Sequence, residues 1–167
     1  MSERKIVVRI KNDSIKNIPN NDAYGTFYST GKQIIDINNN IIFENQINNC
    51  NLELIEDNTS IKIFKSGQYI IHISCYLNNN GFLGVCINDK LDVNTITQSN
   101  MDNIIIINQK MDLKEGNILS FKNCGDNVIT TNISDFIIKN ELHNIHLIIF
   151  KISDIYNLPP KNNILTI

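Results

Sequence analysis

Short stretches of alternating hydrophobic and polar residues recur along the whole chain, and Asn, Asp or Gly closes most of them. A period of two residues is typical of β-strands, because successive side chains of a strand point to opposite faces of a sheet. Nowhere do apolar residues recur at the three- and four-residue spacing of a helix over a dozen positions. The pattern therefore predicts strands joined by tight turns.

The predicted strands cover residues 5–11, 23–29, 32–37, 41–43, 51–55, 60–64, 68–77, 82–87, 103–111, 117–122, 127–133 and 145–152. About ten short strands at regular spacing are typical of an antiparallel sandwich or barrel, and not of a parallel sheet with crossover helices. We expect one all-β domain over residues 23–153. An N-terminal arm with a short strand (residues 1–22) precedes it, and a C-terminal tail (residues 154–167) with Pro159 and Pro160 follows it.

Composition excludes several classes of partner. Ile and Asn are far more frequent than in ordinary proteins, and codons rich in A and T account for part of that excess. Charged residues make up 19% of the chain, the formal net charge is −2, and no run of Lys and Arg occurs. We therefore expect no nucleic-acid partner and no binding to an anionic membrane surface. The longest apolar runs are too short to span a bilayer, and the N-terminal MSERKIVVRIK lacks the apolar stretch of a secretory signal.

Motifs for catalysis or for cofactor binding were not found in the sequence. It lacks a Gly-x-Ser-x-Gly elbow, a phosphate-binding Gly loop and a His-Glu-x-x-His pair. The cysteines Cys50, Cys75, Cys86 and Cys124 form no Cys-x-x-Cys pair, so a zinc site of the usual kind is not expected. Buried free thiols are our main interpretation, and the possible disulfide pairings stay open. We expect no enzyme, no cofactor and no metal site.

Several segments, taken in order, resemble a known family. They are AYGTFYS (23–29), KQIIDINNNIIF (32–43), SIKIFKSGQYIIHISCYL (60–77), FLGVCINDK (82–90), MDLKEGNILSFKNCG (111–125) and HLIIFKI (146–152). Their order resembles the tumour-necrosis-factor-like jelly roll, most closely the C-terminal domain of the collagen-like glycoproteins of bacterial exosporia. The matching positions are Ala23, Tyr24, Gly25, Phe27, Tyr28, Gly67, Tyr69, Leu113, Gly116 and Phe150. Asn117 departs from the Asp that is common in the family, and no collagen Gly-X-Y tract precedes Ala23 in this sequence.

The resemblance implies a two-sheet antiparallel jelly roll of about ten strands, a tight homotrimer, and structural or adhesive work on a surface without catalysis. It also makes segments 23–29, 68–77 and 145–152 neighbours in one sheet. The last two segments are apolar on both alternating faces, which favours a subunit interface, because monomers seldom expose large apolar patches.

We therefore place the following residues at the trimer interface: Tyr24, Phe27, Tyr28, Ile70, His72, Tyr76, His146 and Ile148. The alternative for the aromatic residues is an ordinary core position. Phe27 alternates with Tyr24 and Tyr28, so at least one of these three residues is expected to lie in the core in either case.

The histidines allow a sharper hypothesis. His72 and His146 lie in strands that the resemblance makes adjacent, so three copies could bind a metal or an anion, or form an acid-sensitive latch. A hydrogen-bonded histidine in or beside the core is the simpler interpretation. His143, within Glu141-Leu-His-Asn, is interpreted as a turn residue.

The function that we expect is that of a structural surface protein, a homotrimeric building block of a spore's outer layer that is made in the mother-cell cytoplasm. The missing collagen tract favours a lattice subunit, in which Ile6, Val8 and Ile10 of the arm pair with a neighbour's sheet edge. Two alternatives stay open. One is a capsid or fibre component in the virion of a large AT-rich DNA virus. The other is a module that binds glycans or a receptor through loops 78–81, 96–102 and 124–127.

Overall fold

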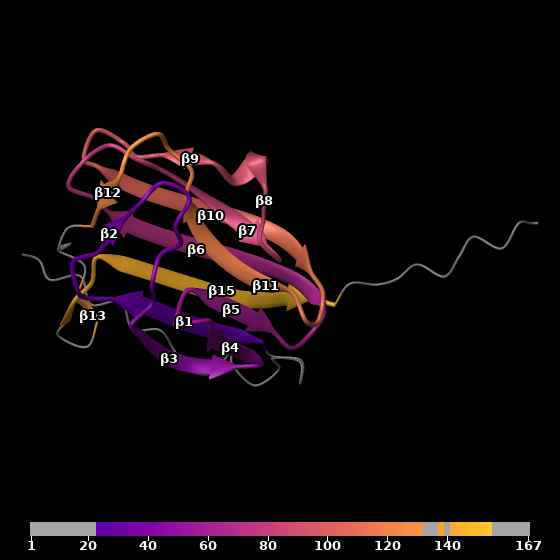
Figure 1. Ribbon diagram of the computed structural model, residues 1–167. Coiled ribbons are helices and arrows are strands. Elements are labelled where there is room, and N and C mark those ends of the chain that lie inside the picture. Colours follow the sequence, from indigo (N-terminus) through magenta and orange to yellow (C-terminus); the bar gives the residue numbers. More distant parts are fainter. Residues whose placement is uncertain (1–22, 132–136, 139–140, 155–167) are drawn as a thin grey trace, which may run out of the picture.

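Two antiparallel sheets stack face to face and enclose a hydrophobic core (Figure 1). The computed structural model describes residues 23–131, 137–138 and 141–154. The predicted arm with Ile6, Val8 and Ile10, and the tail from residue 155 onward, lie outside the described residues. Within the described part, all regular structure is strand except one short 3-10 helix, η2 (Val93–Thr95), which confirms the all-β prediction.

The first sheet has five strands in the order β10-β6-β15-β1-β3. Their bounds are β1 (Tyr24–Ser29), β3 (Asn45–Cys50), β6 (Gly67–Tyr76), β10 (Ile104–Leu113) and β15 (Ile145–Ser153). Strands β6, β15 and β1 are direct neighbours, as the family resemblance implied for segments 68–77, 145–152 and 23–29. The ladder between β6 and β10 runs without a break from Ile104 opposite Tyr76 to Leu113 opposite Gly67.

The second sheet follows the order β4-β5-β11-β7-β8, and β9 pairs with β7 beyond the end of β8. Its strands are β4 (Leu52–Ile55), β5 (Ser60–Ile63), β7 (Phe82–Ile87), β8 (Lys90–Leu91), β9 (Thr97–Gln98) and β11 (Ile118–Asn123). Two small sheets join β2 (Ile34–Ile35) to β12 (Ile129–Thr130) and β13 (Ile137–Ile138) to β14 (Glu141–Leu142). From β5 onward the main strands of the two sheets alternate along the chain, as in a jelly roll.

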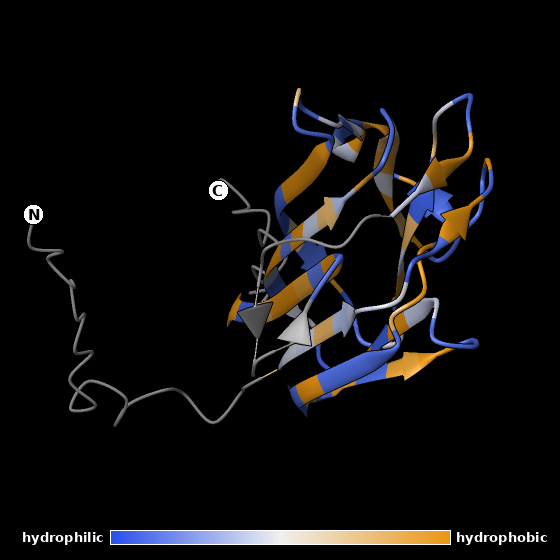
Figure 2. Ribbon diagram, turned by 90° about the vertical axis from the view of Figure 1, so that its left-hand side faces the viewer, coloured by the Kyte–Doolittle hydropathy of each residue, from blue (hydrophilic) through white to orange (hydrophobic). Residues whose placement is uncertain are grey.

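The core lies between the inward faces of the two main sheets. Hydrophobic and hydrophilic residues alternate along the strands, which Figure 2 shows as bands of colour. The ring of Phe43 lies 6.3 Å from that of Phe27 on β1 and 5.8 Å from that of Phe121 on β11, both in edge-on geometry. Such pairs contribute about 0.5–1.5 kcal/mol each beyond the burial of their surface. This aromatic trio therefore ties one sheet to the other.

Asn residues serve many of the turns. Asn38, Asn58, Asn88 and Asn103 have φ angles of 66°, 66°, 50° and 58°, in the left-handed region that most side chains avoid. Asn tolerates this region because its short amide can hydrogen-bond to nearby backbone. Codons rich in A and T account for part of the Asn excess, but these four Asn residues have a conformational role in turns.

Candidate functional site: the outward face of the five-stranded sheet

The five-stranded sheet turns one face to the core and the other away from the six-stranded sheet. Strand register sets which residues share this second face, which we call the outward face. One row across it runs Asn108, His72, Ile148, Thr26 and Ile47. The next row runs Lys110, Ile70, Phe150, Tyr24 and Cys50, and a third runs Ile106, Ser74, His146, Tyr28 and Asn45. Every strand of the sheet contributes to all three rows.

Large hydrophobic side chains on the outward face are left partly in water. Exposure reaches 44% for Tyr24, 48% for Ile106 and 41% for Phe150. Tyr24 lies directly opposite Phe150, which in turn lies opposite Ile70. The exposed apolar surface is thus contiguous across three strands, and a contiguous apolar patch marks an interaction site more often than scattered residues do.

Seven of the eight residues predicted at the trimer interface lie on the outward face: Tyr24, Tyr28, Ile70, His72, Tyr76, His146 and Ile148. Their part in an interface stays a prediction. Phe27 is a correction, because it is fully buried in the core against Phe43. The cause is strand parity: Phe27 is one residue out of step with Tyr28 and so points to the opposite side of β1.

His143 and His146 lie at one end of this face, and His72 lies nearer its middle, in the row next to that of His146. The rings of His143 and Tyr28 pack edge-on with centroids 4.3 Å apart, and the His143 and His146 rings lie 6.4 Å apart. His72 is hydrogen-bonded through Nδ1 to the side chain of Asn108. The interpretation of His143 as a turn residue missed its role: it is 1% exposed and covers Tyr28.

Burial and nearby positive charge both lower the pKa of the His146 side chain. Its pKa falls from 6.5 to about 4, first because burial disfavours the imidazolium and then because charges on His143 and His72 would repel it. At neutral pH this imidazole is therefore uncharged, and the apolar outward face carries no cation at this point.

The loops that we proposed for glycan or receptor binding do come together at one end of the sandwich. Gly81 and Ser99 exchange hydrogen bonds, and Asn127 donates to the backbone oxygen of Asn80. A shallow hollow there is lined by Asn80, Gln98, Ser99, Asn100 and Met101. No aromatic side chain lines it, so a stacking platform for sugars is missing from this hollow.

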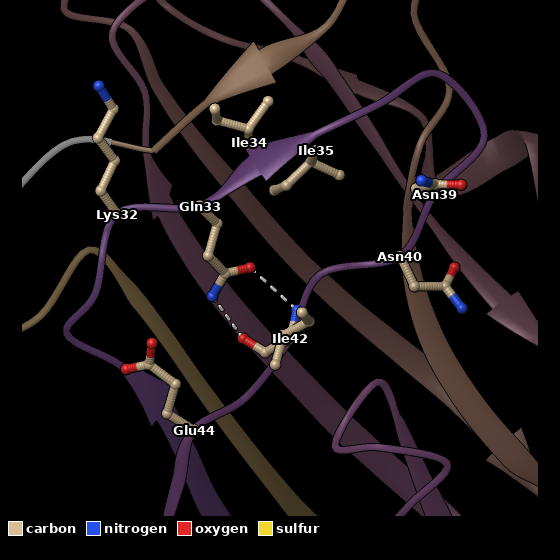
Figure 3. Close-up of a pocket in the computed structure, with 8 residues that line it drawn as sticks. All are labelled: Lys32, Gln33, Ile34, Ile35, Asn39, Asn40, Ile42 and Glu44. Carbon is tan, nitrogen blue, oxygen red and sulfur yellow. Dashed lines mark hydrogen bonds between the residues drawn. The ribbon is translucent and has the colours of Figure 1, made fainter.

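A third feature is a hollow of about 360 Å³ beside β2 (Figure 3). The Gln33 amide forms two hydrogen bonds with the backbone of Ile42, at 2.7 and 3.1 Å. The carboxylate of Glu44 accepts from the backbone N–H groups of Thr30 and Gly31. These polar groups hold the loop around the hollow together, so we assign it no ligand.

The described residues contain no group of three or more His, Cys, Asp or Glu side chains placed to hold a metal ion. In residues 23–131, 137–138 and 141–154, no helix has the length and apolarity that crossing a membrane requires. Cys75 and Cys86 are buried free thiols, and Cys50 and Cys124 are half-buried free thiols. Burial raises the pKa of Cys75 to about 12.

No protein-family model and no curated protein sequence matches the chain. Solved structures do resemble it in fold. Eiger, a tumour-necrosis-factor protein of S. frugiperda, is 10% identical over 84% of this chain and 96% of its own, with a TM-score of 0.59. Murine APRIL is 10% identical over 78% of this chain and 99% of its own, with a TM-score of 0.54. The globular domain of the zebrafish complement 1qA protein is 7% identical over 80% of this chain and 98% of its own, with a TM-score of 0.52. The chain therefore has the tumour-necrosis-factor-like jelly-roll fold that the sequence led us to expect, while the closer resemblance to exosporium proteins stays a prediction.

Proposed function

We propose that the chain is a non-enzymatic structural protein whose copies assemble into a homotrimer through the outward face. The observation that carries the proposal is the apolar surface of that face, on a sheet whose other side already forms the core. Tyr24, Phe150 and Ile106 keep more than two fifths of their surface in water. A second copy of the chain would remove this apolar surface from water. Such burial stabilises a complex by about 25 cal/mol per Å² of apolar surface.

The composition of the face also fits a protein partner. Tyr and Phe are enriched at interfaces, and charged residues are depleted at their centres. The centre of the outward face holds Ile148, Ile70 and Phe150, whereas Lys110 and Asp112 lie on β10, at the edge of the sheet. The resemblance to trimeric jelly rolls supports a closed ring of three copies over an open chain of them.

The finer role that we propose is a building block of a spore's outer layer. It rests on the resemblance to exosporium glycoprotein domains. The arm residues Ile6, Val8 and Ile10 would link one trimer to the sheet edge of another by adding a strand. A capsid or fibre component of a large AT-rich DNA virus is the alternative, with the same trimer in another particle.

Antibodies raised against the purified chain test this role on thin sections of spores, or of virus particles, from the organism that encodes it. Label over the outermost spore layer supports the proposal, and label over virions supports the alternative. Label confined to the cell interior contradicts both. Electron microscopy of the purified chain, with and without residues 1–20, tests the arm: arrays or fibres that persist after the deletion show that the arm is not the connector.

Binding of glycans or a receptor is a second candidate function, favoured by the convergence of loops 78–81, 96–102 and 124–127 at one end of the sandwich. A glycan array probed with the intact chain tests the first of these ligands. Hits that disappear when Asn80 and Asn100 are replaced by Ala would support glycan binding, and an array without hits would exclude glycans as ligands.

A further inference from the structure

Strand β10 lies at the edge of the five-stranded sheet, so one side of its backbone has no neighbouring strand. The hydrogen bonds at its start show which residues face that side. Leu77, after β6, donates its N–H to the C=O of Asn103, whereas the N–H and C=O of Ile104 both bond to Asn100 in the preceding loop. Successive residues of a strand turn their backbone groups to opposite sides. The odd-numbered residues of β10 therefore bond to β6, and the even-numbered residues direct their N–H and C=O groups away from the sheet.

Beyond Ile104 this row of backbone groups is unpaired. In the part of the chain that the structure describes, no group bonds to the backbone N–H or C=O of Ile106, Asn108, Lys110 or Asp112. All four residues are exposed, and the ladder to β6 on the other side has no bulge. A long, regular edge of this kind is a ready template for another strand.

The other edges of the two main sheets offer less. In β3, Asn48 has a φ angle of 49°, and the register with β1 shifts between Tyr24 and Thr26. Strand β4 has four residues, and the side chain of Asn49 already bonds to the C=O of Leu52. Strands β8 and β9 have two residues each. Because bulges and short strands protect an edge from pairing, β10 is the edge best suited to accept a strand.

The N-terminal arm supplies a segment of matching length and character. Residues 5–11, KIVVRIK, number seven, as do residues 106–112, and they contain no Gly or Pro. Val and Ile favour strands. As a strand, the segment would present Ile6, Val8 and Ile10 on one face of the sheet and its three cationic side chains on the other.

The chain between this segment and the first described residue limits where the segment can bind. Residues 12–22 number eleven, and such a stretch spans at most about 36–40 Å when extended. The described chain begins at Ala23, whose C=O accepts a hydrogen bond from Lys151 of β15. From there the direct path to β10 of the same chain crosses β15 and β6 over the outward face, which the proposed trimer covers. The path to its own β10 is thus blocked in the trimer, whereas the arm is long enough to extend to another trimer.

We propose that β10 is the edge that receives the arm: residues 5–11 of a chain in one trimer add a strand along residues 106–112 of a chain in another. This inference rests on the proposed homotrimer, and it names the edge through which trimers are linked. The five-stranded sheet gains a sixth strand from a second copy of the chain, and the bonds that hold it come from the backbone of β10.

A proline substitution tests the edge in the full chain. Lys110→Pro removes an N–H that points away from β6, and proline is tolerated in edge strands where its position faces solvent. We expect this variant to form trimers but no larger species in sedimentation velocity at high protein concentration, where the unaltered chain forms both. Lys110→Ala is the matched control, because it removes the same side chain and keeps the N–H. It should assemble as the unaltered chain does.

Hydrogen exchange tests the arm. The full chain with Ile6→Ser, Val8→Ser and Ile10→Ser is compared with the unaltered chain by mass spectrometry with electron-transfer fragmentation, which resolves single amides. Amides of the even-numbered residues 106–112 should exchange at least about tenfold faster in the arm variant, whereas those of residues 105–111 with odd numbers stay protected by β6. This experiment also decides the matter if Lys110→Pro fails to fold, which near-ultraviolet circular dichroism of the tyrosines reports.

The possible outcomes separate this inference from the proposed function. A chain that is monomeric at high concentration overturns the homotrimer on which the inference rests. Trimers that form no larger species, or larger species that survive Lys110→Pro, overturn the role of β10 and leave the homotrimer intact. Even-numbered amides that are equally protected in the arm variant, as in direct pairing of two β10 edges, overturn the role of the arm. Protection that is lost without any change in mass places the arm on its own chain and overturns the link between copies.

Discussion

Phe150 gives the sharpest test of the outward face. The side chain is 41% exposed in the single chain and lies between Tyr24 on β1 and Ile70 on β6. We expect Phe150→Ser to abolish or greatly weaken assembly while the jelly roll still folds, because the residue is not part of the core.

The size of the effect follows from the surface left to bury. A Phe side chain buries about 200 Å² when it is fully covered, so roughly 80 Å² of Phe150 remains for an interface. At about 25 cal/mol per Å² this corresponds to ~2 kcal/mol per subunit. Three copies give ~6 kcal/mol per trimer, which is a factor of about 10⁴ in the association constant.

The matched control is Phe64→Ser. Phe64 is 38% exposed, nearly as much as Phe150, but it follows β5 of the other sheet, with Lys62 stacked over its ring at 5.3 Å. Sedimentation equilibrium over a range of concentrations compares both variants with the unaltered chain. Equal effects of the two substitutions, or an unchanged assembly for Phe150→Ser, would refute the assignment of the outward face as the interface.

Two more predictions concern the interior. Phe121→Ala should lower the free energy of unfolding by about 3–5 kcal/mol, because the substitution opens a cavity beside Phe43 at the junction of the sheets. Guanidinium titration measures this free energy. A loss below about 1 kcal/mol would contradict the packing described. Cys75, fully buried with a pKa of about 12, should resist a thiol reagent at pH 8 until denaturant is added. Mass spectrometry after labelling identifies the modified cysteines, and rapid labelling of Cys75 in the folded chain would show that the core is open.

The alternation of residues predicted the strands that carry one buried face. Strands β6, β10 and β15 were found because side chains in contact with the core recur at every second position. The edge strand β3, Asn45–Cys50, was missed, since none of its side chains is fully buried and its sequence is mostly polar. Its pairing with β1 comes from backbone hydrogen bonds, which leave no trace in the pattern.

The segment 41–43 shows the opposite error. Ile41 and Phe43 are fully buried and alternate with the exposed Ile42, so the pattern resembled a strand. The segment instead forms isolated backbone bonds, from Ile41 to Phe121 and from Phe43 to Asn58. Alternation reports which side chains are buried, and not whether a continuous ladder is formed.

The candidate site was predicted in part, because the alternation of residues also reports burial on the outward side of a strand. A strand that is apolar on both faces indicates a second buried surface, and this placed Ile70 and Ile148 correctly on the outward face. Strand parity alone would have removed Phe27 from the set. The burial of His143 was missed although the adjacency of β1 and β15 was expected, because it depends on a ring contact with Tyr28, which is distant in the sequence.

The mass of the native particle tests the central claim most directly. Sedimentation equilibrium of the full chain at pH 7.5, in reductant and at micromolar concentration, should give three times the chain mass of 19.1 kDa. A stable 19.1 kDa species at those concentrations, with its tyrosine dichroism intact, would contradict the account, because the outward face would then stand in water without a partner.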